Sequence, residues 1–294
     1  MQSFAYSTPP SVAEAARTAL QEDAKLMAGG QTLLQSMKLG LIAPSAVIDI
    51  SGIAELKGIT VAGGKVTIGA GTTHAAVAAS RDVQTAIPAL AELASHIGDR
   101  QVRNRGTLGG SLANNDPAAC YPAAVMGLDA SVQTNKRTLT AEQFFTGMFS
   151  TALQDGEVIT SVSFPIPEKA GWQKFKQPAS RFSLVGVFVS KGPAGVRVAV
   201  TGAGASGVFR ATELETKLAS NWSAAALAGA TVPSADLNSD LHGSAEYRAA
   251  LIPVLAMPCM IWRCNSRKTA STGSTTTTEP ASSRPYFVAF WPTA

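Results

Sequence analysis

Residues 25–34 read KLMAGGQTLL and contain the first of two glycine pairs that stand out in the first part of the chain. A short apolar segment, residues 24–28, leads into Gly29 and Gly30, which are followed by a polar pair and a stretch of helical character. Glycine lets the backbone turn and lets a ligand approach closely, and successive N–H groups at such a turn converge on an anion. The stretch therefore predicts a strand, an anion-binding turn and a helix.

A second glycine pair lies in residues 103–117, RNRGTLGGSLANNDP. Gly109 and Gly110 again stand between hydroxyl and amide residues, with two arginines just upstream. We expect residues 99–115 to form a basic, glycine-rich loop. Either glycine pair alone is more often a plain turn, but two such loops in one domain fit a ligand with a diphosphate.

Alternating helices and strands are expected around these loops. Ser11 and Glu14 have the spacing of a capping box before a helix that runs to Leu20. A hairpin is expected around Gly63 and Gly64. The other elements expected before residue 170 are strands at 46–50 and 158–164 and helices at 89–97 and 117–128. Beyond it we expect strands at 172–176, 183–191 and 196–202 and helices at 212–219 and 245–256.

The sequence divides into three parts. We expect one domain over residues 1–170, ending at a Pro-Ile-Pro segment, and a second over residues 171–256. Residues 257–294 include a run of four threonines and show almost no helical or strand period, which predicts a disordered tail.

Composition excludes several classes. Charged residues make up 15% of the 294, and lysine plus arginine exceed aspartate plus glutamate by 24 − 20 = 4. Without a run of five like charges, nucleic acid is not the favoured partner. No uncharged apolar run approaches the ~18 residues of a membrane span, and no secretory signal is visible. Three scattered cysteines and three scattered histidines form neither a disulfide framework nor a metal site, so we expect the reducing cytoplasm.

A third glycine-rich stretch, residues 202–207, has the spacing of a dinucleotide fingerprint and keeps a nicotinamide-dependent enzyme open as an alternative. It lacks a helix directly after it and an acidic residue ~20 positions on, which favours a structural loop. Asp99 and Asp116 are more typical of a cap or turn than of an acid–base pair. Cys120 and His96 are more typical of structural residues than of a nucleophile or a base.

The two glycine loops, taken together, resemble the FAD-binding medium subunit of the molybdenum hydroxylases, the family of carbon monoxide dehydrogenase and xanthine dehydrogenase. The resemblance covers residues 1–256. The stretches that carry it are AGGQTL (28–33), RNRGTLGGS (103–111), DPA (116–118), GEVI (156–159), FP (164–165) and FKQPASRF (175–182).

This resemblance implies an α+β fold: a two-part FAD-binding domain of the PCMH type, then a smaller C-terminal domain with an antiparallel sheet and helices. The two loops would hold the FAD diphosphate and its surroundings, one residue in the GEVI stretch would pack at the flavin ring, and a lysine would lie near its polar edge. Family members commonly carry an acidic residue where this chain has a cysteine three positions after Pro117, so a hydrogen bond to FAD is lost or replaced there. The implied FAD-binding residues are Met27, Ala28, Gly29, Gly30, Gln31, Thr32, Leu33, Thr107, Leu108, Gly109, Gly110, Ser111, Cys120, Ile159 and Lys176.

The resemblance also implies the partners. A large subunit with a molybdenum cofactor would hydroxylate the substrate with oxygen from water. A small subunit with two [2Fe–2S] clusters would pass electrons to FAD in this chain, and FAD would pass them to an external acceptor. We expect no catalytic acid or base and no metal in this subunit. The substrate would be a purine or another N-heterocycle, such as xanthine or caffeine, with carbon monoxide or an aldehyde as alternatives. A free-standing FAD or nicotinamide oxidoreductase is the competing interpretation.

Overall fold

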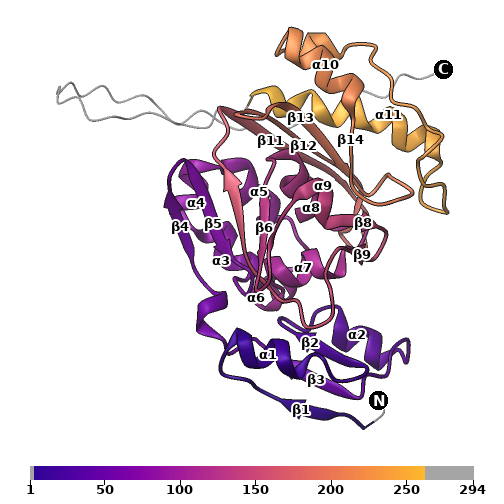
Figure 1. The fold of residues 1–294 in the computed structure, drawn as a ribbon. Helices are drawn as coiled ribbons and strands as arrows, with labels where there is room; N and C mark the ends of the chain where they lie inside the picture. Colours follow the sequence, from indigo (N-terminus) through magenta and orange to yellow (C-terminus); the bar gives the residue numbers. More distant parts are fainter. Residues whose placement is uncertain (1–2, 262–294) are drawn as a thin grey trace, which may run out of the picture.

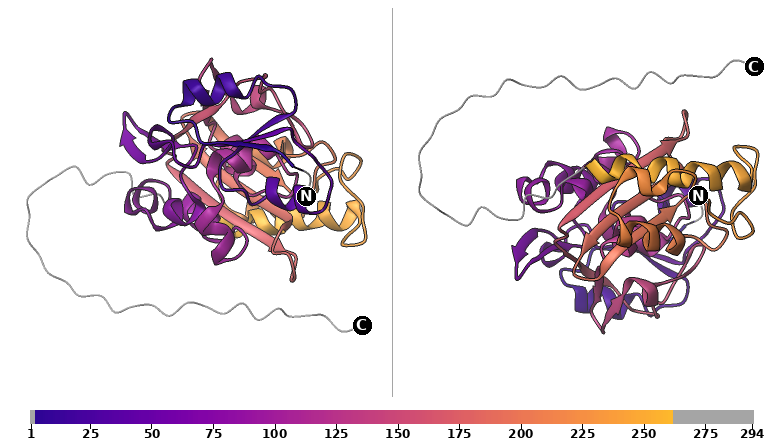
Figure 2. Two further views of the ribbon diagram at one scale, coloured as in Figure 1. Left: turned by 90° about the horizontal axis from the view of Figure 1, so that it is seen from below. Right: turned by 90° about the horizontal axis from the view of Figure 1, so that it is seen from above.

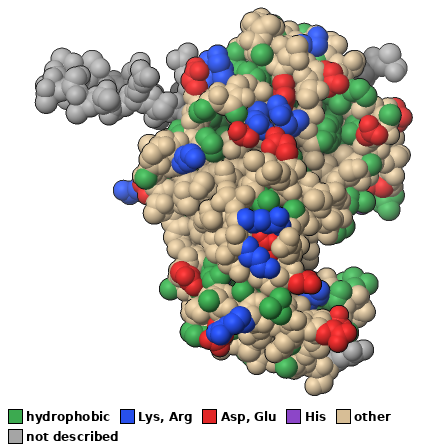
Figure 3. All heavy atoms as spheres, in the orientation of Figure 1, with side chains coloured by type: hydrophobic (Ala, Val, Ile, Leu, Met, Phe, Trp, Pro, Cys, Tyr) green, Lys and Arg blue, Asp and Glu red, His purple; other side chains and the backbone are tan. Residues whose placement is uncertain are grey.

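Three main β-sheets follow one another along the molecule in chain order (Figure 1). The computed structural model describes residues 3–261. The first sheet is parallel and three-stranded, the second is antiparallel and five-stranded, and the third is antiparallel and four-stranded. The surface narrows between the first sheet and the rest of the molecule (Figure 3).

The first sheet has the order β1-β3-β2. Its N-terminal helix begins as predicted, since the Ser11 side chain accepts a hydrogen bond from the backbone N–H of Glu14. The elements of this part are β1 (Ala5–Ser7), α1 (Val12–Thr18), β2 (Ala24–Met27), α2 (Leu33–Lys38), β3 (Ala46–Asp49) and the 3-10 turn η1 (Ala54–Leu56).

The second sheet has the order β4-β5-β10-β6-β7. The predicted hairpin is confirmed, with Gly63 and Gly64 at φ +57° and +73° in the turn. The strands are β4 (Ile59–Ala62), β5 (Lys65–Gly69), β6 (Ser131–Thr134), β7 (Thr138–Thr140) and β10 (Ile159–Pro165), and β8 (Phe145–Gly147) pairs separately with β9 (Ser150–Thr151). The helices are α3 (His74–Ala79), α4 (Arg81–Ala86), α5 (Pro88–Ser95), α6 (Arg100–Arg105), α7 (Leu108–Asn114), α8 (Tyr121–Gly127) and α9 (Ala141–Phe144).

The predicted loop over residues 99–115 is wrong, because this segment forms helices α6 and α7. Asp99 caps the first and Thr107 the second, each accepting a backbone N–H three residues on. Glycine is a weak helix former, but here it allows close packing: a Cβ on Gly109 would lie 2.6 Å from the Cβ of Ala70. The glycines therefore mark a tight contact rather than a loop.

The helix predicted from Pro117 begins later, at Tyr121. The preceding residues are tied to the third sheet, since the carbonyl of Pro117 accepts hydrogen bonds from the backbone of Gly202 and the hydroxyl of Thr201.

The third sheet has the order β11-β12-β13-β14, and its predicted strands are confirmed. Helices α10 and α11 cover its outer face, as Figure 2 shows from above, and α8 packs against β12 and β13. The elements are β11 (Lys169–Lys176), β12 (Ser183–Gly192), β13 (Gly195–Thr201), β14 (Phe209–Arg210), α10 (Thr212–Ser220), η2 (Ala224–Leu227), α11 (Ala245–Ala256) and η3 (Pro258–Ile261).

A shared core joins the second and third sheets. Trp172, Phe188 and Ala199 of the third sheet are buried in the same cluster as the strands and helices of the second. A domain boundary at residue 170 would fall just inside the start of β11, which begins at Lys169, and it stays a prediction.

The tail predicted from Met257 needs correction for its first five residues. Residues 258–261 form η3, and Cys259 is fully buried. A Cβ on Gly171 would lie 2.5 Å from the Cα of Cys259, so this turn packs directly on β11. The remainder of the predicted tail lies outside the described residues.

Candidate functional site

The two glycine loops meet at the junction between the first sheet and the rest of the molecule (Figure 1). A Cβ on Gly29 would lie 2.6 Å from the carbonyl carbon of Arg105 and 2.8 Å from the Cα of Gly106. The Cβ of Ala28 lies 4.0 Å from the position that a Cβ on Gly110 would take. Segments almost eighty residues apart in the sequence thus form one surface.

The first loop presents unused hydrogen-bond donors. Within the described residues, the backbone N–H groups of Gly30, Gln31, Thr32 and Leu33 donate to no protein acceptor. Gly30 has a φ of +68°, a left-handed conformation that side chains other than glycine rarely adopt. Successive N–H groups around a left-handed residue form a concave anion-binding nest.

The second loop has a different role, because its donors are occupied. The N–H of Leu108 donates to the Thr72 carbonyl at 3.1 Å, and that of Gly109 to the Ala70 carbonyl at 2.8 Å. Gly110 and Ser111 donate to the side chain and the carbonyl of Thr107. Leu108 and Gly109 are also buried. This loop can therefore offer a ligand the exposed surface of Gly110 and the side chain of Ser111.

His74 supports the second loop from below. The backbone N–H of His74 donates to the Gly106 carbonyl at 3.0 Å. The imidazole Nε2 of His74 would lie 2.6 Å from a Cβ on Gly106. Burial, with a smaller effect from the charge of Arg103, lowers the pKa of His74 to about 4. The imidazole is therefore neutral at pH 7. Its ring lies against that of Tyr121, with centroids 5.3 Å apart.

Asp49 lies at the end of β3, next to the strand that leads into the first loop. It is paired in register with Met27. Its carboxylate accepts hydrogen bonds from the Tyr6 hydroxyl at 2.7 Å and the Ser51 N–H at 2.8 Å. The carboxyl ends of neighbouring parallel strands are the usual ligand-binding edge of such sheets.

A second group of predicted residues lies at the other end of α7, towards the third sheet. Cys120 is buried, and its Sγ lies 3.3 Å from the Nζ of Lys174 and 3.6 Å from the Oγ of Ser183. Lys174 also donates to the His96 carbonyl at 3.1 Å. Lys174 and the predicted Lys176 line one cavity of about 100 Å³ beside this cluster.

Ile159 is 5% exposed and lies in the core at the start of β10. It is connected to the second loop through the backbone: Ala70 donates to the Thr160 carbonyl and accepts from Gly109. The predicted site residues thus fall into a group at the glycine loops, a group at the third sheet, and Ile159 beneath α7.

Sequence reasoning missed His74, Asn115 and Lys174. Asn115 ends α7 in the left-handed region and donates from its side chain to the carbonyls of Gly147 and Ser150, both at 2.8 Å. Lys174 could have been found from the sequence. Residues two apart on a strand share a face of the sheet, which places Lys174 beside Lys176.

The third glycine-rich stretch makes packing and hydrogen-bond contacts within the fold. In residues 202–207, Gly202 packs on the carbonyl of Ser183, where a Cβ would lie at 2.5 Å, and its own carbonyl accepts a hydrogen bond from Arg248 at 2.8 Å. No cluster of metal-ligating side chains and no helix able to cross a membrane occurs in residues 3–261.

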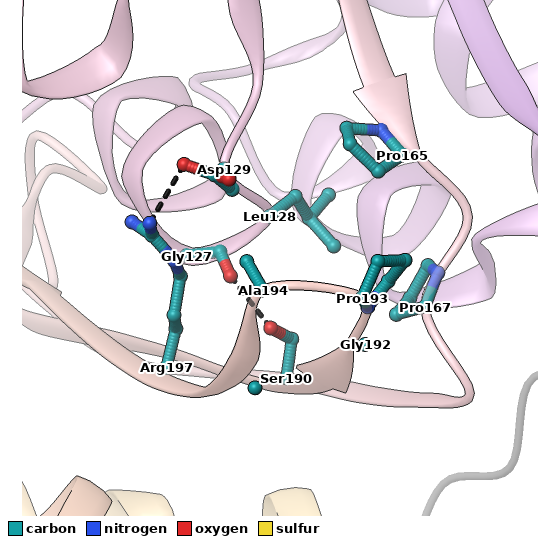
Figure 4. A pocket seen from close by; sticks show the side chains of 11 residues that line it. Gly127, Leu128, Asp129, Pro165, Pro167, Ser190, Gly192, Pro193, Ala194 and Arg197 are labelled. Atoms are coloured by element: carbon teal, nitrogen blue, oxygen red, sulfur yellow. Dashed lines mark hydrogen bonds and ion pairs between the residues drawn. The ribbon is translucent and has the colours of Figure 1, made fainter.

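A pocket of about 40 Å³ lies where β10, α8 and the β12–β13 turn meet (Figure 4). Its polar groups pair with each other: Arg197 forms an ion pair with Asp129 at 2.7 Å, and Ser190 donates to the Gly127 carbonyl at 2.6 Å. Three prolines complete its wall. We interpret this pocket as part of the packing between the sheets.

Comparison with known proteins identifies the family. The domain described as "FAD binding domain in molybdopterin dehydrogenase" matches residues 2–167. The nicotine 6-hydroxylase medium subunit of Paenarthrobacter nicotinovorans is 36% identical, over 85% of this chain and 93% of that protein. The carbon monoxide dehydrogenase medium chain of Hydrogenophaga pseudoflava is 35% identical, over 84% and 92%.

Solved structures agree with these sequences. Carbon monoxide dehydrogenase from Hydrogenophaga pseudoflava superposes with a TM-score of 0.80 at 33% identity, covering 89% of this chain and 97% of that one. Quinoline 2-oxidoreductase from Pseudomonas putida 86 gives 0.79 at 28% identity, covering 88% and 96%. The predicted α+β fold and family are confirmed: the chain belongs to the FAD-binding medium subunits of the molybdenum hydroxylases.

Proposed function

We propose that this chain binds FAD across the two glycine loops and transfers electrons within a heterotrimeric molybdenum hydroxylase. The observation that carries the proposal is the set of unused N–H groups from Gly30 to Leu33 beside a residue at φ +68°. These donors fit the oxygens of a diphosphate. The facing surface of Gly110 lacks a side chain, which leaves room for a ligand to approach the backbone.

Helix α7 defines the direction in which a bound cofactor would extend. It begins at the glycine loops and ends near the turn that leads to Cys120. An extended FAD with its diphosphate on the first loop would follow α7 towards Lys174 and Lys176. When bound, FAD accepts electrons and delivers them to an external acceptor. Positive charge near the ring favours its anionic reduced form, so these lysines would raise its reduction potential.

The family resemblance implies an acidic residue at the position of Cys120. A thiol is a weak hydrogen-bond acceptor, and here its Sγ is already in contact with Lys174 and Ser183. We infer that Cys120 contributes to the shape of the ring site, whereas FAD retention rests on the glycine loops. Ile159, which is buried beneath α7, would support the ring from the core side.

The partners follow from what this chain lacks. A [2Fe–2S] cluster held by cysteine alone needs four cysteine ligands, and the whole sequence has three cysteines. We therefore assign the clusters to a small partner subunit and the molybdenum cofactor to a large one. The free, buried thiols of Cys120 and Cys259 fit a reducing compartment, and we place the complex in the cytoplasm.

The substrate of the complex is an N-heterocycle in this proposal, with purines and methylxanthines included. Among the similar proteins are a nicotine 6-hydroxylase medium subunit and, at 31% identity over 60% of this chain, a caffeine dehydrogenase subunit beta from Pseudomonas sp.. The carbon monoxide dehydrogenase relatives keep carbon monoxide as the competing substrate.

The first experiment identifies the bound ligand. The purified chain is denatured with acid and the released ligand is identified by mass. FAD at about one per chain supports the proposal, since the site offers one diphosphate cradle. A chain that retains no flavin after reconstitution contradicts it. Co-purification with neighbouring gene products, followed by assays with N-heterocycles, aldehydes and carbon monoxide, then tests the complex and its substrate.

A further inference from the structure

A cavity of about 100 Å³ between α5 and β11 has no role in FAD retention as described above. Two features of its wall point to a ligand: a buried donor with no hydrogen-bond partner and two lysines that form no ion pair within residues 3–261. The residues that line it are Glu92, His96, Trp172, Gln173, Lys174 and Lys176.

The unpaired donor is the indole nitrogen of Trp172. This side chain is 1% exposed, and its Nε1 has no hydrogen-bond partner. Its six-membered ring covers Gly186 of β12, where a Cβ would lie 2.5 Å from Cη2. Trp172 is also one of the residues that line the cavity. A buried N–H without an acceptor is unfavourable, and an acceptor in the cavity would remove that cost.

The cations are Lys174 and Lys176, on the same face of β11. Neither forms an ion pair with a carboxylate of residues 3–261. Lys174 donates to the His96 carbonyl and contacts the Cys120 thiol, which leaves one of its three N–H bonds for another acceptor.

Three cations act on the His96 side chain, which lines the same cavity. Burial lowers the pKa of its imidazole, and the charges of Lys174, Lys176 and Arg103 lower it further. The imidazole is therefore neutral at pH 7 and adds no cation. Glu92 places one carboxylate at the same wall, so the cavity favours a small anion over a large polyanion.

We propose that this cavity binds a small oxyanion, a carboxylate or a phosphate, held by the ammonium groups of Lys174 and Lys176 and the indole N–H of Trp172. A bound anion would pair with charges that otherwise act on the thiol of Cys120 and on the adjoining ring site. The proposal stands on the cavity alone and does not require FAD to be bound.

The test uses inorganic phosphate and, in a second arm, acetate, each titrated calorimetrically into the full-length chain at pH 7.5. We expect saturable binding at one site. Lys174→Met should weaken it by about tenfold, as expected for the loss of one charge-assisted hydrogen bond. Trp172→Phe keeps most of the ring and removes only the N–H, so it should weaken binding by several-fold. The matched control is Lys169→Met, on the same strand but facing Trp222, and should leave the affinity unchanged.

A second readout is the His96 imidazole itself. A bound anion should raise its pKa, observed by NMR titration, and Lys174→Met should suppress the ligand-dependent part of that shift. Tighter binding of phosphate or of acetate identifies which oxyanion the cavity takes. The proposal is overturned if the heat of titration does not saturate, or if the Lys169 and Lys174 substitutions weaken anion binding equally. Water would then be the occupant of the cavity. FAD content measured in the same samples separates this outcome from a failure of the FAD proposal.

Discussion

Gly29 packs directly on the backbone of Arg105, with 2.6 Å between the position of a Cβ on Gly29 and the Arg105 carbonyl carbon. This contact fixes the first sheet against the second, and it places the unused N–H groups of residues 30–33 opposite Gly110. The glycine at this position is therefore required by packing between segments, and only its neighbour Gly30 is required by the conformation of the turn.

Gly29→Ala should separate the two loops. The added methyl group overlaps main-chain atoms that have no side-chain freedom, so the free energy of unfolding should fall by about 1–3 kcal/mol and FAD content should fall with it. Urea unfolding and flavin absorbance measure the two effects. Gly52→Ala is the control, because a Cβ there meets nothing within 4 Å. Equal stability of both variants would contradict the packing role.

Gly30→Val and Gly110→Val should abolish flavin retention, because each places a branched side chain at the surface where the diphosphate approaches the backbone. Gly30 also has a positive φ, so strain has to be separated from obstruction. Gly40→Val provides this control: Gly40 has a φ of +70° and nothing within 4 Å of its Cβ position. Wild-type flavin content in the Gly30 and Gly110 variants would refute the assignment of the site.

Much of the fold was predictable because its signals are local. The Ser11 cap, the Gly63-Gly64 turn and the strands of the third sheet each depend on residues next to one another. The error at residues 99–115 has the opposite cause. Position 109 in helix α7 holds a glycine because Ala70, far away in the sequence, leaves no room for a Cβ, and no local pattern reports that distance.

The same distinction applies to the site. The first loop was recognisable because its strand, glycines and helix are contiguous. The contact of Cys120 with Lys174 depends on how α8 meets β11, and the neutral state of His74 depends on burial. Such features follow from the packing of separate elements.

Protonation of His74 should destabilise the protein in mildly acidic solution. Burial holds the folded-state pKa at about 4, below the ordinary histidine value of 6.5. The neutral imidazole therefore contributes fully above pH 6.5, and this stability is lost as the pH falls from 6.5 to 4, by at most about 3 kcal/mol. His74→Phe should flatten the pH dependence of urea unfolding in this window. His242→Gln, at an exposed loop position, should leave it unchanged, and an unchanged curve for His74→Phe would disprove the argument.

Arg137 should stabilise the second sheet by compensating a buried charge. The side chain of Glu157 is fully buried and accepts hydrogen bonds from Arg137 Nε at 2.9 Å, the Thr134 hydroxyl at 2.8 Å and the Gln154 N–H at 2.9 Å. Burial alone would raise the pKa of Glu157, but these hydrogen bonds outweigh it and hold the pKa at about 2.

Arg137→Met would leave the Glu157 carboxylate buried beside fewer donors. We expect the free energy of unfolding to fall by about 2–3 kcal/mol at pH 7. This loss is at or below the usual cost of breaking a buried ion pair, because the arginine is partly exposed. The sign of the pH dependence follows from the lowered pKa: the stabilisation is complete above the ordinary glutamate pKa of 4.5 and is lost as the pH falls from 4.5 towards 2. The difference in the free energy of unfolding between wild type and Arg137→Met, measured with urea, should therefore become smaller as the pH falls through this window. Lys136→Met, a neighbouring cation that donates to the Asp155 carbonyl at the surface, should cost little at any pH. A difference between wild type and Arg137→Met that stays constant down to pH 3 would show that the arginine acts by packing and not by its charge.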